Sequence, residues 1–123
     1  MCKKALDLGL AYYTITDHCE CDQYDGSVFF GGRKYRDAVR ASYAELEKNI
    51  KCFPELRFLK GIELSQPLQD LSAAEDAFSG RTYDFVIGSL HQIKNEEDFY
   101  YLNPESFTQE ELDDVFHRYI CGK

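Results

Sequence analysis

Residues 12–18 read YYTITDH, an aromatic and β-branched run that ends in an aspartate and a histidine. Such side chains favour strands, so we expect a short buried strand over residues 12–16 that stops at Asp17 and His18. Two later runs have the same form, LRFLKGIEL at 56–64 and FVIGSL at 85–90. The chain therefore contains three predicted strands.

Segments with helical patterns separate these strands. Apolar residues recur at helical spacing from about 35 to 51, and a shorter helix is expected over 69–78. A first helix over residues 1–10 ends at Gly9, and residues 19–33 have the glycine and aspartate content of a loop. Thr108 and Glu111 have the spacing of a capping box, which predicts the start of a last helix.

The order α-β-α-β-α-β-α predicts an α/β fold with parallel strands and right-handed crossovers. A complete (β/α) barrel needs about 250 residues, whereas this chain has 123. We therefore expect one partial domain over residues 1–123, a slice of a larger barrel with flanking helices.

Composition restricts the function. The net charge of -8 disfavours nucleic acid as a partner, although one local cationic or metal site would still accept a small phosphorylated substrate. The chain has no apolar run of about 18 residues, so no membrane partner is expected. Five cysteines without a disulfide framework, and no recognisable signal peptide, favour a cytoplasmic location.

A residue of a type that binds metals stands at or just after the end of each of the three predicted strands. His18 ends the first strand, Glu63 the second, and His91 follows the third. Because the carboxyl ends of parallel strands meet at one edge, these three side chains are expected to converge. Imidazole and carboxylate ligands suit Zn, Mn or Fe, and a carboxylate can bridge two metals. Gly61 and Gly88 are expected to let the backbone pack closely near this site. A structural histidine or a surface glutamate remains the alternative for each residue taken singly.

Smaller features have weaker chemical meaning. Glu20 is a candidate for facing the metals or the substrate, with a solvated loop charge as the alternative. Arg33, in a basic stretch with Lys34 and Arg36, is a candidate phosphate contact, since guanidinium groups bind phosphate bidentately. Cys19 and Cys21 flank Glu20, but one Cys-x-Cys pair is a weak zinc signal.

The segments ALDLGLAYYTITDHCE (5–20), FLKGIEL (58–64) and DFVIGSLHQI (84–93) together resemble the PHP (polymerase and histidinol phosphatase) family, with its T-D-H, G-x-E and G-S-x-H strand ends. Among its members the pattern is most similar to the histidinol-phosphatase branch, which hydrolyses L-histidinol phosphate in histidine biosynthesis.

The resemblance implies a distorted (β/α)7 barrel with two or three divalent metal ions. His18 and His91 would be metal ligands, Glu63 would bridge two metals, and Asp17 would contact the His18 ring and fix its tautomer. It implies a metal-dependent phosphomonoester hydrolase that needs no protein nucleophile.

The chain also departs from the family pattern. It has no H-x-H strand at its start and no later D-x-H, and its one other histidine is His117, in the last predicted helix. We therefore expect a fragment that lacks the N-terminal H-x-H strand and the C-terminal strands. Three alternatives stay open: an inactive remnant that binds metal weakly, association with itself or with a complementing chain, and a PHP phosphoesterase with another small substrate.

Overall fold

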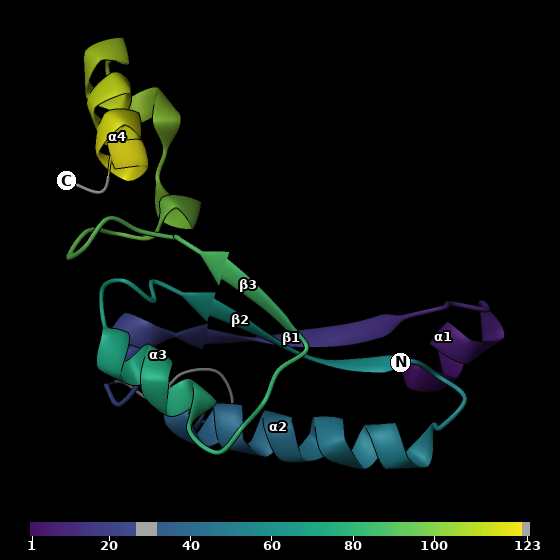
Figure 1. Ribbon diagram of the computed structural model, residues 1–123. Coiled ribbons are helices and arrows are strands. Elements are labelled where there is room, and N and C mark those ends of the chain that lie inside the picture. Colours follow the sequence, from purple (N-terminus) through teal and green to yellow (C-terminus); the bar gives the residue numbers. More distant parts are fainter. Residues whose placement is uncertain (27–31, 122–123) are drawn as a thin grey trace. The chain divides into compact units, whose positions relative to one another are not determined.

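The computed structural model describes residues 1–26 and 32–121, which form two compact units, Met1–Ser89 and the segment from Leu90 onward (Figure 1). The first unit has the order α1 (Cys2–Asp7), β1 (Tyr13–Glu20), a 3-10 turn (Cys21–Gln23), α2 (Tyr35–Cys52), β2 (Phe58–Ser65), α3 (Leu71–Phe78) and β3 (Phe85–Ser89). The second contains 3-10 turns at Phe99–Tyr101 and Pro104–Ser106 and then α4 (Gln109–Cys121). The predicted alternation of helices and strands is confirmed. Residues 27–31 of the predicted loop lie outside the described residues.

The three strands form one parallel sheet in the order β1-β2-β3. Tyr13 pairs with Phe58 at the start of the β1–β2 ladder, and Glu20 pairs with Ser65 at its end. Since all three strands run the same way, their carboxyl ends lie at one edge of the sheet (Figure 1). This edge is where the sequence predicts the functional residues.

The first strand is longer than the sequence predicts. Its expected end at Asp17 and His18 is wrong, because β1 continues to Glu20. Cys19 is fully buried and pairs with Leu64, so burial and ladder hydrogen bonds extend the strand past its polar residues. As a result Glu20 is held on a strand and not on a free loop.

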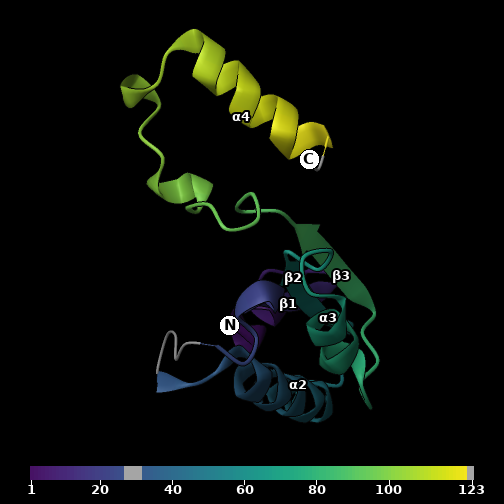
Figure 2. The same ribbon diagram turned by 90° about the vertical axis from the view of Figure 1, so that its left-hand side faces the viewer.

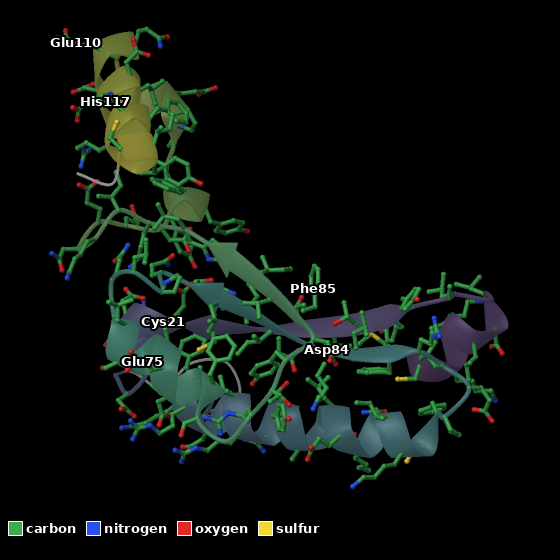
Figure 3. All side chains as sticks on the ribbon, in the orientation of Figure 1. Cys21, Glu75, Asp84, Phe85, Glu110 and His117 are labelled. Carbon is green, nitrogen blue, oxygen red and sulfur yellow. The ribbon has the colours of Figure 1, made fainter. Side chains whose placement is uncertain are left out.

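Helices α2 and α3 cover one face of the sheet (Figure 2). Two apolar clusters lie between these layers, one around Cys19, Val39 and Ile62 and the other around Leu46 and Phe58. Because side chains alternate along a strand, the even-numbered residues of β1 and the odd-numbered residues of β2 project from the opposite face. Figure 3 shows Phe85 of β3 on that opposite face as well.

Gly61 lies at a close approach between β1 and β2. A Cβ added there would be 2.5 Å from Thr14 Oγ1 and 2.7 Å from the carbonyl oxygen of Ile15. The expected tight packing at Gly61 is therefore confirmed. The same expectation is wrong for Gly88, where an added Cβ meets no atom of the described residues within 4 Å.

The second unit has a well-capped helix. The backbone N–H of Thr108 donates to Glu111 Oε2 at 2.7 Å, and the N–H of Glu111 donates to Thr108 Oγ1 at 3.3 Å. This reciprocal pair is the predicted capping box. None of the helices in the described part of the chain is long and apolar enough to cross a membrane.

Candidate metal centre

His18 and Glu63 lie directly opposite each other near the carboxyl ends of β1 and β2. Both side chains project from the face opposite to that of their neighbours Cys19 and Ile62, which pack in the core under the helices. The Nδ1 atom of His18 is 3.5 Å from Oε2 of Glu63. The parallel register thus brings together two of the predicted metal ligands, which are 45 residues apart in sequence.

Glu20 joins them from the last residue of β1. Its side chain is buried, and its Oε1 lies 2.7 Å from Nε2 of His18. The hydrogen bond with the Glu20 carboxylate, together with the charges of Glu20 and Glu63, raises the pKa of His18, against an opposing effect of burial. One imidazole therefore lies between two carboxylates, an arrangement that favours positive charge at this point.

This set of side chains fits a divalent metal. Two carboxylates and an imidazole supply the oxygen and nitrogen ligands that Zn, Mn and Fe accept. Glu20 is 7% exposed, and a buried carboxylate needs a compensating partner. The His18 proton supplies that partner here, and a cation would supply more positive charge at the same place.

Two serines connect these side chains. Ser89 Oγ, at the end of β3, donates to Glu63 Oε1 at 3.0 Å and lies 2.7 Å from Ser65 Oγ. The Ser65 hydroxyl, which is fully buried, is 3.4 Å from Nδ1 of His18. Glu63 and His18 are therefore linked through hydroxyl groups from the ends of β2 and β3.

Gln66, the residue after β2, completes the group. Its side-chain amide donates to Glu20 Oε2 at 2.6 Å, and its backbone N–H donates to the carbonyl oxygen of Ser89 at 2.9 Å. We call the whole group the strand-end cluster; its members are His18, Glu20, Glu63, Ser65, Gln66 and Ser89.

Asp17, to which the family resemblance assigns the orientation of the His18 ring, precedes His18 on β1. Neighbouring residues of a strand point to opposite faces, so Asp17 faces the helix layer. There its Oδ2 accepts a hydrogen bond from Ser42 Oγ of α2 at 2.5 Å. The contacts of the His18 ring include hydrogen bonds with Glu20 and Ser65. The orientation of His18 by Asp17 stays a prediction.

Two other predicted site residues, His91 and Arg33, are not members of the strand-end cluster as defined above. His91 follows the end of β3 by two residues and belongs to the second unit, where its carbonyl oxygen accepts from the backbone N–H of Phe99 at 2.8 Å. Arg33 is exposed, two residues before α2. Its neighbour Arg36 forms ion pairs with Asp25 and Asp76. Ligation by His91 and phosphate contact by Arg33 stay predictions.

Cys19 and Cys21 are fully buried in the core beside the cluster. A hydrogen bond with Cys21, together with burial, raises the pKa of the Cys19 thiol. The same hydrogen bond lowers the pKa of the Cys21 thiol. The complete burial of both side chains in the apolar core supports a packing role for the pair. Figure 3 shows Cys21 between the sheet and α3.

A cavity of about 590 Å³ adjoins His18 within the first unit. Asp17 and His18 line it from β1, and Tyr35 and Val39 line it from α2. The Tyr35 ring meets the His18 ring at 6.0 Å between centroids, in an edge-on arrangement. The volume of this cavity and its largely apolar lining are typical of a small-molecule site.

Three residues of the cluster were not singled out as site residues from the sequence: Ser65, Gln66 and Ser89. Ser89 belongs to the G-S-x-H strand end, and this position alone could have suggested a role. Ser65 and Gln66 lie just past the predicted end of the second strand at residue 64. Only the register, which pairs Ser65 with Ser89, reveals that they meet the site.

The family model of the PHP domain matches residues 1–123. No curated protein matches the chain, and no solved structure does. PHP domains are in general metal-binding hydrolases of the phosphoesterase type, which accords with the side chains in the strand-end cluster. The chain, an α/β structure with three parallel strands, therefore belongs to the PHP domain family.

Proposed function

We propose that this chain is a metal-dependent phosphomonoester hydrolase, with L-histidinol phosphate as its substrate. The observation that carries the proposal is the approach of Glu20 and Glu63 to the two nitrogens of a single His18 ring. Membership of the PHP family supports the hydrolase activity, and the resemblance to the histidinol-phosphatase branch supports the substrate.

In this proposal the metal ligands are His18, Glu20 and Glu63, joined by His91. His91 stands two residues beyond β3, at the strand end that also carries Ser89, a hydrogen-bond donor to Glu63. Two or three ions of Zn, Mn or Fe would complete the site together with the further strands of a distorted (β/α)7 barrel. A divalent metal supplies Lewis acidity toward a phosphate oxygen and makes water a better nucleophile.

The side chains of the site would bind the substrate and hold the metal ligands in place. Glu63 is held by Ser89 so that one oxygen is fixed and the other faces His18. The cavity beside His18 would admit the organic part of a small phosphate ester, with Tyr35 and Val39 excluding water from it. Arg33 is proposed as a contact for the phosphate group.

A second candidate function is supported by the surface of β3. Phe85, Val86 and Ile87 are between 38% and 46% exposed, so both faces of the strand present apolar area. Exposed apolar strands are typical of interaction surfaces. In this alternative the chain is a catalytically inactive PHP fragment that binds metal weakly, or associates with itself or with a complementing chain. A PHP phosphoesterase with another small substrate is a third candidate.

A phosphatase assay separates these candidates. The purified chain, supplied with Mn²⁺ or Zn²⁺, would be offered L-histidinol phosphate and a set of other small phosphomonoesters. We expect phosphate release from L-histidinol phosphate, abolished by Glu63→Gln and unaffected by His117→Ala. Release from another ester alone would favour the third candidate. Metal binding without hydrolysis of any ester would favour the inactive fragment or the complementing chain.

A further inference from the structure

Gln66 occupies a conformation that a glutamine rarely adopts. Its φ of 54° lies in the left-handed region, although it is not a glycine. Its side chain is almost completely buried, at 1% exposed. Strained backbone of this kind persists where surrounding contacts hold it, and it gathers at functional sites.

The contacts of Gln66 explain what holds it. Its backbone N–H donates to Ser89 at the end of β3, at 2.9 Å. Its side-chain amide donates to Oε2 of Glu20 at the end of β1, at 2.6 Å. Gln66 therefore ties together the ends of the two outer strands, from a corner just past the central strand.

The two oxygens of Glu20 consequently have different partners. Oε2 is held by Gln66, while Oε1 faces Nε2 of His18 at 2.7 Å. The neutral amide of Gln66 holds the carboxylate by a hydrogen bond and leaves its negative charge in place, whereas a lysine or arginine would neutralise that charge. The full negative charge of Glu20 thus remains directed at the place where His18 lies.

We propose that Gln66 is a positioning residue for the metal centre, which holds one oxygen of Glu20 so that the other oxygen alone is presented to a divalent cation. This inference rests on the proposed function, because it needs a metal beside His18. Outer partners of metal ligands typically change metal affinity by about 10- to 100-fold. We place Gln66 in that role, acting through Glu20.

A purely structural role makes a different prediction. If Gln66 served only to shape the corner after β2, glycine would serve at least as well, because glycine adopts a positive φ without strain. Gln66→Gly would then keep the metal affinity, and Gln66→Leu would lose it together with stability. In our account both variants lack the amide, so both lose affinity alike.

The test is calorimetric titration of Mn²⁺ into the full chain and its variants. We expect Gln66→Leu and Gln66→Gly each to weaken binding by about tenfold. In a Glu20→Gln background, Gln66→Gly should weaken binding no further, because the amide would have lost the carboxylate through which it acts. The visible spectrum of the Co²⁺-loaded chain should change in Gln66→Gly, since it reports the ligands of the ion. Gln109→Leu is a matched control: Gln109 also donates to a carboxylate, Asp113 at 2.8 Å, but on the exposed surface of α4, and its loss should leave affinity unchanged.

The outcomes are distinguishable. A wild-type chain that binds neither Mn²⁺ nor Co²⁺ overturns the proposed function, and this inference with it. A wild-type chain that binds metal, with unchanged affinity in Gln66→Gly or with losses that add in the double variant, overturns the inference alone. If Gln66→Leu fails to fold, as circular dichroism would reveal, Gln66→Gly still decides, because its backbone suits the left-handed corner.

Discussion

His18 and Glu63 face each other across the ladder between β1 and β2, and their side chains approach to 3.5 Å from the same face of the sheet. The register that pairs them is set by the burial of their neighbours in the strands. A slip of one residue would turn one of the two side chains into the helix layer. The candidate metal centre therefore depends on the close packing of β1 against β2.

That packing predicts that alanine substitution destabilises the fold at one glycine of the sheet and not at another. An alanine at position 61 would place its Cβ 2.5 Å from Thr14 Oγ1, whereas at position 88 it meets no described atom within 4 Å. We expect Gly61→Ala to lower the free energy of unfolding by about 2 kcal/mol, the usual cost of overpacking. Gly88→Ala should change it by less than about 0.5 kcal/mol. Urea unfolding of both variants checks this, and equal effects would contradict the described register.

The packing of α2 on the sheet predicts different stability losses for a buried and an exposed leucine. Leu46 of α2 is 3% exposed, whereas Leu68 is 87% exposed. Leu46→Ala should cost about 3 kcal/mol of unfolding free energy, through lost burial and a residual cavity. Leu68→Ala, the matched control, should cost less than about 0.5 kcal/mol. A small effect at Leu46 would mean that α2 does not pack on the sheet as described.

Asp76 predicts a pH dependence of stability. The hydroxyl of Tyr24 donates to it at 2.8 Å, and this bond, with the charges of Arg36, Arg40 and Arg81, lowers the pKa of Asp76 below its ordinary value of 3.8. A carboxyl with a lowered folded-state pKa contributes stability above the unfolded pKa, and loses it as pH falls through the folded pKa.

Asp76→Asn should therefore lower the unfolding free energy by about 1 kcal/mol at pH 7. The difference from wild type should shrink as the pH falls below about 4. Urea titrations at several pH values measure it, with the exposed neighbour Glu75→Gln as control. A difference that stays constant with pH would rule out the ionised form of Asp76 as its source.

Much of this structure follows from the sequence, and the exceptions have physical causes. The three strands, the capping box at Thr108 and the convergence of His18 and Glu63 follow from side-chain patterns and from parallel topology. The end of β1 does not, because the burial of Cys19 comes from packing against residues far away in sequence. The role of Asp17 comes from the family resemblance alone, and its hydrogen bond with Ser42 could not be predicted, because the two residues are 25 positions apart in sequence. Gln66 could not be found from the sequence, because nothing local predicts its left-handed backbone.

The role of His91 as a ligand gives a further prediction. His91→Ala should weaken Mn²⁺ binding by more than about tenfold, whereas His117→Ala should leave it unchanged. His117 is exposed on α4, which makes it a matched histidine control. Calorimetric titration compares the two variants, and wild-type affinity in His91→Ala would remove this residue from the site.

The most direct test of the central claim is the metal content of the chain, measured by elemental analysis after gel filtration. We predict about one or more ions of Zn, Mn or Fe per chain, lost in His18→Ala and in Glu63→Ala but kept in His117→Ala. A wild-type chain without bound metal, even after supplementation, would contradict the assignment of the strand-end cluster as a metal centre.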